Sequence, residues 1–348
     1  YAVNLYDTSK PRKYDKPYNQ VTFRTAGPSA MSIPVGLDDD LSAMLLNNDV
    51  DPEVPEGTEY YLPAGSSYRV TPFALMKGFR LAGSRDGVKP IVVLEGSWSI
   101  AEGSYLSSLE FDNIEFRHEA NNNYFMNTSK AYTIENVSFV NCDFISLRRG
   151  FWRHQSANTK YIMNLEMEGC RFEGCGWQTS AYGTFNLQSF DKDNGVSYDQ
   201  VDRAIFRNCT FSNDNDGTNG YGWGNLFYAP YMDKPIELEY KNVTIYNYSR
   251  NQRLINIESA VGSKLVMQGI LLASPCGDLY AIGANTTTTF SDNYTTADYA
   301  LGGSKMNATD LEITADKLFA DPVNGDLTIK DTSSPIVSSR AGDTRWLP

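Results

Sequence analysis

A short pattern of apolar and polar residues returns along the middle of the chain. Each copy has an apolar residue, any residue, Asn or Gly, then Cys, Val or Ile, and an apolar residue two positions later. The Asn or Gly positions are 113, 141, 169, 208, 242 and 269, at intervals of 28, 28, 39, 34 and 27 residues. Such intervals fit one coil of three short strands plus insertions, and one coil cannot bury its inner face alone. The pattern predicts an all-β chain folded as a right-handed parallel β-helix.

A second row of strand-like runs follows the first, at 124–129, 151–156, 184–189, 226–231, 254–259 and 280–285. Side chains alternate between the two faces of a strand. We therefore expect an inward column of Phe125, Trp152, Phe185, Phe227, Ile255 and Ala281. The same alternation points Met126, Arg153, Asn186, Tyr228, Asn256 and Ile282 outward, joined two residues later by Gln155, Gln188 and Glu258. The outer face of this row is predicted to be a polar stripe.

Stacked coils place like residues above like residues, so the repeated positions should form columns. Asn113, Asn141, Asn208 and Asn242 are expected to form a hydrogen-bonded ladder at a bend. Cys142, Cys170 and Cys209 are expected to be a buried column of thiols, which is a structural role and not a metal-binding one.

The two ends of the chain carry signals for caps. Residues 38–46 predict a short amphipathic helix with Asp at its N-terminus, which would plug the first coil. Residues 318–346 contain turns and a late aromatic residue that are typical of a closing cap. Residues 1–30 resemble the last two strands of an immunoglobulin-like or fibronectin-like module, or an extended lead-in. We expect a β-helix with both caps over residues 31–348, cut from a longer parent protein.

Composition narrows the classes of function. The chain has 348 residues and a formal net charge of −12, without a run of Lys or Arg, which disfavours nucleic acid as a partner. No apolar stretch approaches the roughly 18 residues that span a bilayer, so no transmembrane segment is expected. Five cysteines show no spacing typical of a zinc site or a disulfide framework.

From about residue 38 to 346 the chain resembles the pectate-lyase-like β-helix proteins of uncharacterised function that accompany glycan-uptake systems of gut-type Bacteroidota. The resemblance lies in the Asp-Asp-Leu helix, the Leu-Pro-Ala-Gly turn at 62–65, the Asn-Cys-x-Phe repeats, Arg149-Gly150 and the ending from Phe319 to Trp346. It implies export to the outer-membrane surface or periplasm of a Gram-negative bacterium, as a lipoprotein. It also implies a polysaccharide ligand and outer-membrane glycan-uptake partners, without a demonstrated reaction.

Aromatic residues on glycine-rich insertions are candidates for stacking against sugar rings, although they could equally pack over the edges of the coils. Together with the polar stripe they give these predicted ligand-binding residues: Arg153, Gln155, Trp177, Tyr182, Asn186, Gln188, Tyr221, Trp223, Tyr228, Asn256 and Glu258.

The segment 148–154 is the densest positive stretch in an acidic chain and could bind uronate carboxylates. The alternative is that its arginines pair with nearby acids while Gly150 makes a turn. Were the protein a lyase, Arg149, Arg153 and His154 would be its catalytic residues, although a hydrogen-bonded core histidine is the favoured interpretation of His154. Two acidic loops, with Asp191 and Asp193 and with Asp214 and Asp216, are weak candidates for Ca²⁺.

No pair of carboxylates indicates a hydrolase, because the predicted stripe offers only Glu258. The sequence therefore favours non-catalytic binding of a pectin-like or other acidic polysaccharide. A polysaccharide lyase acting by β-elimination ranks second, and a structural spacer ranks third.

Overall fold

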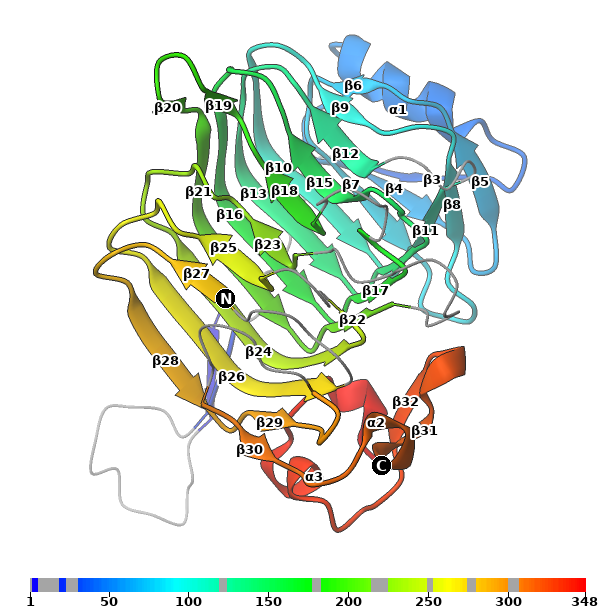
Figure 1. Cartoon of the computed structure of the whole chain (residues 1–348). Coiled ribbons are helices and arrows are strands. Elements are labelled where there is room, and N and C mark those ends of the chain that lie inside the picture. Colours follow the sequence, from blue (N-terminus) through cyan, green and yellow to red (C-terminus); the bar gives the residue numbers. More distant parts are fainter. Residues whose placement is uncertain are drawn as a thin grey trace.

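The computed structural model describes residues 31–118, 124–176, 183–213, 225–248, 253–273, 280–299 and 307–348, and strands β1 (Ala2–Leu5) and β2 (Asn19–Thr22) before them. Within these ranges about half of the residues are in strands and few are helical, and the strands form mainly an 18-stranded sheet and a six-stranded sheet of parallel strands. In Figure 1 the colours run in sequence order from one end of the stack to the other. This arrangement is consistent with an all-β parallel solenoid.

Each repeat of the stack contributes a long strand, a short strand after a bend, and a strand of the six-stranded sheet. The long strands pair in sequence order, so that Leu106, Ile134, Ile162 and Val201 lie side by side. They are β10 (Ser104–Asp112), β13 (Tyr132–Val140), β16 (Lys160–Glu168), β21 (Asp199–Arg207), β24 (Glu237–Tyr246) and β26 (Lys264–Ala273). The short strands are β11 (Glu115–His118), β14 (Asp143–Ile145), β17 (Arg171–Glu173) and β22 (Thr210–Ser212), whereas β24 and β26 continue through the bend.

The six-stranded sheet consists of one strand from each successive repeat, and it lies across the stack from the long strands (Figure 1). Its members are β12 (Tyr124–Thr128), β15 (Gly150–His154), β18 (Phe185–Leu187), β23 (Phe227–Tyr228), β25 (Ile255–Ile257) and β27 (Tyr280–Ile282). One hairpin interrupts this regularity, because β19 (Phe190–Asp191) and β20 (Val196–Ser197) pair antiparallel between β18 and β21.

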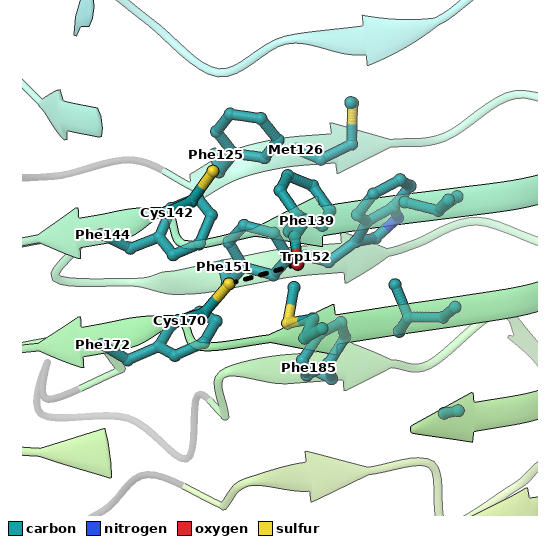
Figure 2. Packing of buried hydrophobic residues seen from close by; sticks show 14 of the residues in the cluster. Phe125, Met126, Phe139, Cys142, Phe144, Phe151, Trp152, Cys170, Phe172 and Phe185 are labelled. Atoms are coloured by element: carbon teal, nitrogen blue, oxygen red, sulfur yellow. Dashed lines mark hydrogen bonds between the residues drawn. The ribbon is translucent and has the colours of Figure 1, made fainter. Parts of the chain in front are cut away.

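Columns of aromatic rings fill the space between the sheets, as Figure 2 shows for the middle repeats. Phe144 stacks on Phe116 at 5.5 Å between ring centroids and on Phe172 at 4.8 Å, and Phe172 stacks on Phe211 at 4.7 Å. These four rings occupy the same register position in consecutive strands, so the parallel pairing itself brings like side chains together.

The cysteine column is confirmed as a structural feature. Cys142, Cys170 and Cys209 are fully buried, and the Cys170 thiol contacts the main-chain oxygen of Phe139 at 3.4 Å (Figure 2). Burial raises the pKa of the Cys142 and Cys209 thiols well above the ordinary value, so they remain protonated. Protonated, buried thiols pack as small apolar groups.

The bends explain why Asn and Gly recur in the sequence. Asn113, Asn141, Asn208 and Asn242 have φ between 49° and 57°, and Gly169 and Gly269 have φ of 65°. This left-handed region is costly for most residues but open to Gly and tolerated by Asn. The predicted ladder is wrong beyond its first pair: Asn141 Nδ2 donates to Asn113 Oδ1 at 2.6 Å, whereas Asn208 Nδ2 donates to Glu168 Oε1 at 2.6 Å. The ladder stops because Gly169 has no side chain to continue it.

Replacing Asn141 tests the conformational origin of this pattern. We expect Asn141→Ala to lower the free energy of unfolding by about 1–2 kcal/mol more than Asn141→Gly, because alanine pays the steric cost of the left-handed conformation. Both variants lose the hydrogen bond to Asn113. The difference between their free energies of unfolding therefore measures the cost of the left-handed backbone conformation alone. Urea denaturation of the two variants measures it, and equal stabilities would contradict this origin.

The first strands and the N-terminal helix begin the stack. Helix α1 (Leu41–Val50) starts at Asp40, whose carboxylate accepts the Ala43 N–H at 3.0 Å, and it buries Leu41 and Leu45 in the main core. A short helix was predicted here, but it begins three residues later than expected. The strands beside it are β3 (Ser32–Pro34), β4 (Thr58–Leu62), β5 (Ser67–Val70), β6 (Ala74–Leu75), β7 (Phe79–Gly83), β8 (Ile91–Leu94) and β9 (Ser99–Ile100).

The C-terminal segment runs back along the bends of the stack. Its N–H groups at Gly342 and Asp343 donate to Gly269 O at 2.8 Å and Thr244 Oγ1 at 2.9 Å, and Arg345 donates to Gly169 O. A second apolar cluster joins this segment to the ends of β24 and β26. The described C-terminal part of the chain, from residue 287 on, contains β28 (Thr287–Ser291), β29 (Tyr294–Thr295), β30 (Thr309–Asp310), α2 (Ala315–Leu318), β31 (Phe319–Asp321), β32 (Asp326–Ile329) and α3 (Pro335–Ser339), followed by a 3-10 turn at Thr344–Trp346. The predicted cap thus covers a flank of the stack.

Strands β1 and β2 pair antiparallel, with Ala2 opposite Thr22. Two strands were predicted in residues 1–30, and their assignment to an immunoglobulin-like or fibronectin-like module remains a prediction.

Candidate functional site

The outer face of the six-stranded sheet carries one column of polar side chains. Pairing places Asn127, Arg153, Asn186, Tyr228, Asn256 and Ala281 side by side. The column facing the core is Met126, Trp152, Phe185, Phe227, Ile255 and Tyr280. The predicted faces therefore match this register in the four middle strands. At the first strand Phe125 is buried in the core as predicted and stacks on Phe151, but the outward prediction for Met126 is wrong. At the last strand the register places Tyr280, not Ala281, in the inward column. At the first strand Phe125 and Met126 are both buried, so simple alternation fails there.

The exposure of this column differs from the prediction at two positions. Asn186 is 1% exposed and Asn256 4%, so neither amide is presented to solvent. Each is used internally, because Asn186 Oδ1 accepts a hydrogen bond from Gln188 Nε2 and Asn256 Oδ1 accepts from the Glu258 N–H at 3.2 Å. Arg153, Gln155, Gln188 and Tyr228 are half-buried, and Glu258 is exposed. These five predicted side chains, together with the half-buried Asn127 beside Arg153, are polar groups that the face offers to a ligand.

Arg153 stands at one end of this face. Its guanidinium lies over the Tyr124 ring, 5.5 Å from the centroid, an arrangement that favours a cation over the ring face. The turn before it requires glycine, since Gly150 has φ of 134° and a Cβ there would come within 2.2 Å of Gly183 O. Arg148 and Arg149 are half-buried within that turn.

His154 is sealed inside the protein. Its Nε2 lies 2.6 Å from the Tyr132 hydroxyl and its Nδ1 lies 2.7 Å from Asp199 Oδ1, and all three residues are buried. Because a carboxylate can only accept, Nδ1 carries the proton and Nε2 accepts the Tyr132 O–H. The Tyr132 oxygen in turn accepts the Trp152 indole N–H at 3.3 Å. Both ring nitrogens are occupied, as expected for a hydrogen-bonded core histidine.

A buried lysine lies near the Asp199 carboxylate and opposes its negative charge. Lys160 is 0% exposed and lies between Tyr132 and Asp199 in the register of the long strands. Its ammonium donates to the main-chain oxygens of Ser156 at 3.0 Å and Asn158 at 2.6 Å. Burial lowers the pKa of Lys160 to about 8, against the opposing attraction of Asp199. We call Tyr132, His154, Lys160 and Asp199 the buried relay.

The buried relay predicts an acid-sensitive stability. Burial lowers the pKa of His154, so the unfolded chain takes up a proton at pH values where the folded chain does not. The contribution of His154 to the free energy of unfolding is fully present above about pH 6.5, the pKa of histidine in the unfolded chain. As the pH falls from there towards the lower pKa of the folded state, the free energy of unfolding decreases by about 1.4 kcal/mol per pH unit for one proton. Urea denaturation between about pH 7.5 and 5 measures the slope. We expect a smaller slope for His154→Gln, and an unchanged slope would contradict the assignment.

An aromatic pair borders the polar face and was missed by the sequence analysis. Phe190 of the β19–β20 hairpin stacks on Tyr231, which follows β23, at 4.3 Å between centroids and 13° between planes. Both residues are half-buried. Tyr231 follows Tyr228 of the polar column by three residues. Burial raises the pKa of Tyr228, and Tyr231 and Glu258 add to the shift. Arg253, also unpredicted, pairs with Glu258 at 3.0 Å.

The predicted acidic loop at the hairpin is a turn. Asp191 Oδ1 accepts the N–H groups of Asp193 at 2.9 Å and Asn194 at 3.2 Å, so its carboxylate is used to close the chain reversal. No group of three or more His, Cys, Asp or Glu side chains suited to a metal ion occurs among the described residues. Trp177, Tyr182, Tyr221, Trp223, Asp214 and Asp216 lie outside the described residues.

Comparison with known proteins adds no assignment, because no protein-family model and no curated protein matches the chain. In the ranges that the structure describes, no helix is both long enough and apolar enough to cross a membrane.

Proposed function

We propose that the chain is a right-handed parallel β-helix of the pectate-lyase-like kind, and that it binds a polysaccharide on the outer face of its six-stranded sheet without cleaving it. The observation that carries the proposal is the register of that face. Arg153 lies on β15 and Tyr228 on β23, while Gln155, Gln188 and Glu258 directly follow β15, β18 and β25. Hydrogen-bonding groups therefore recur along the stack at about the 4.8 Å spacing of strands. A polymer of similar sugar units can meet such a repeating row along its length.

The proposed ligand class is an acidic glycan, pectin-like or otherwise rich in uronates. The Arg153 guanidinium can donate two parallel hydrogen bonds to a carboxylate, which gives both strength and orientation. Its position over Tyr124 holds it at the edge of the face. Phe190 and Tyr231 would supply apolar surface for a sugar ring.

Binding is favoured over β-elimination because the available base is enclosed. A general base must reach the proton that it removes, directly or through one water. His154 is 0% exposed and is hydrogen-bonded through both ring nitrogens. Of the three predicted lyase residues, Arg149 and Arg153 are the two that are not enclosed.

We also propose glycan capture at the outer-membrane surface or in the periplasm of a Gram-negative bacterium, beside outer-membrane glycan-uptake proteins. This part of the proposal rests on the sequence resemblance of residues 38–346.

Affinity gel electrophoresis with polygalacturonate, with and without calcium, tests the proposal directly. We expect retardation of the wild-type protein and a roughly 10- to 100-fold weaker Kd for Arg153→Ala, the range for losing a hydrogen bond to a charged group. Arg203→Ala is the matched control, since Arg203 pairs with Glu166 at 3.0 Å on the outer face of the 18-stranded sheet.

Three outcomes of this experiment would contradict the proposal. Ultraviolet-absorbing unsaturated products would establish a lyase and overturn the non-catalytic proposal. Retardation by neutral glucans alone would refute the acidic ligand class. An absence of retardation by every acidic and neutral glycan tried would favour a structural spacer.

A further inference from the structure

The β19–β20 hairpin interrupts an otherwise regular connection. In the two preceding repeats the chain passes directly from the end of a six-stranded-sheet strand to the next long strand, from Thr128 to Tyr132 and from His154 to Lys160. The equivalent passage from Leu187 to Asp199 is longer and contains the hairpin. In Figure 1 the hairpin projects from the edge of the stack where β18 gives way to β21.

Few contacts hold the base of this hairpin. The Ser189 N–H donates to Asp199 Oδ2 at 2.6 Å, and the Tyr198 N–H donates to Ser189 O at 2.8 Å. The Ser189 hydroxyl is buried and has no hydrogen-bond partner within the described part of the chain. The Asp199 carboxylate is therefore the side chain that fastens Ser189.

Asp199 has its other oxygen in the buried relay. Oδ1 accepts the His154 Nδ1–H at 2.7 Å while Oδ2 accepts the Ser189 N–H, so one carboxylate ties the hairpin to the preceding repeat. His154 also lies between Arg153 and Gln155 in the chain, and the Thr128 hydroxyl donates to Arg153 O at 3.1 Å. The same contacts thus fix the backbone of the polar face and the base of the hairpin.

The hairpin delivers Phe190 to the polar face. Phe190 directly follows Ser189, and its ring stacks on Tyr231 at 4.3 Å. Because Phe190 is the next residue after Ser189, the position of its ring depends on the hydrogen bond that holds Ser189 to Asp199. An aromatic surface held in one orientation costs little conformational entropy when a sugar ring stacks on it.

We infer that Asp199 is a positioning residue that anchors the β19–β20 hairpin to the His154 relay, and that the Phe190–Tyr231 pair it holds is a stacking subsite for a sugar ring. The second half of this inference rests on the proposed function. The first half concerns the fold alone and can be tested without any ligand.

Hydrogen exchange measured by mass spectrometry tests the anchor. We expect peptides covering residues 186–199 to exchange roughly tenfold faster or more in Asp199→Asn. The NH2 group of the new amide is a donor, and it would point at either the Ser189 N–H or the His154 Nδ1–H, which are also donors. Ile162→Ala is the control: Ile162 is 2% exposed on β16, the long strand that follows His154, and its side chain makes no hydrogen bond to the hairpin or to the buried relay. Equal acceleration in both variants would overturn the anchor.

Imidazole nitrogen NMR adds a readout that a general loss of stability does not move. The chain has two histidines, so His154 is assigned by comparison with a His118 variant. The wild-type protein should show the Nδ1–H tautomer of His154, and Asp199→Asn should shift it towards Nε2–H. An Nε2–H tautomer in the wild-type protein would refute the relay even if Asp199→Asn does not fold.

The stacking subsite is tested with Phe190→Ala and polygalacturonate as the probe. Phe190 is half-buried on a hairpin, so the variant should fold, and retardation should weaken by roughly tenfold, the upper range for one stacked aromatic ring. Unchanged retardation would overturn the subsite while leaving the proposed function standing. A wild-type protein that binds no glycan would overturn the proposed function and the subsite together, and leave the anchor to be judged by exchange.

Discussion

Replacing Asp199 by alanine is expected to lower the free energy of unfolding by about 3–5 kcal/mol, because two buried hydrogen bonds to a charged acceptor are lost and each contributes about 1.5–3 kcal/mol. The carboxylate is 2% exposed and serves three groups at once: the His154 imidazole, the Ser189 N–H and, through space, the Lys160 ammonium. Without it the two donors lose their acceptor, and the Lys160 ammonium loses the stronger of the two carboxylates that attract it, the other being Glu102. Urea denaturation followed by circular dichroism gives the change.

Asp202→Ala is the control for this prediction. Asp202 is exposed on the same strand β21 and accepts hydrogen bonds from Gln200 at 2.8 Å and from Tyr161. Surface interactions of this kind contribute at most about 1 kcal/mol. A loss for Asp199→Ala as small as that for Asp202→Ala would mean that the buried relay contributes nothing to folding.

Phe144→Ala is expected to cost about 3–5 kcal/mol of unfolding free energy, as for other large-to-small changes in a core. The ring is 0% exposed, and it lies between the stacked rings of Phe116 and Phe172 with Phe151 at 4.6 Å. Parallel pairing fixes all of these neighbours, so the cavity cannot close by a small shift of one side chain. Urea denaturation monitored by intrinsic fluorescence measures the loss.

Two further variants bracket that effect. Phe144→Leu keeps most of the buried volume and should cost clearly less. Ile145→Ala changes the next residue, which is half-exposed on the opposite face of β14, and should cost about 1 kcal/mol or less. A comparable loss at residues 144 and 145 would show that the ring column is not what stabilises the middle repeats.

The sequence predicted the strand series well because one repeated phrase encodes both a bend and its flanking strands. Asn or Gly at positions 113 to 269 allowed a left-handed backbone, and the apolar residues around each of them alternated as a strand requires. Parallel stacking then converts the repeat directly into register. The same reasoning placed Phe125 correctly in the core but failed at Met126, because two successive apolar residues are both buried there and alternation cannot hold.

The buried relay had a signal in the sequence that could have been used. Tyr132, Lys160 and Asp199 each lie nine positions before the Asn or Gly of their bends at 141, 169 and 208, so the register alone puts them in one column. What the register could not show is that this column is buried. Burial depends on His154 entering from the six-stranded sheet and on the hairpin that follows Ser189.

By itself the sequence determined the order of the strands, the residues at the bends and the columns of Phe and Cys, since these follow from local periodicity and from stacking of identical units. Only the tertiary structure decided which polar side chains reach solvent. Asn186 and Asn256 were predicted to point outward, yet both are buried, and their side-chain oxygens accept hydrogen bonds from Gln188 and from the Glu258 N–H. His154 was predicted to lie in the core, but its partners Tyr132 and Asp199 were not predicted. The Phe190–Tyr231 pair likewise depends on a hairpin meeting the next repeat, which no repeating pattern encodes.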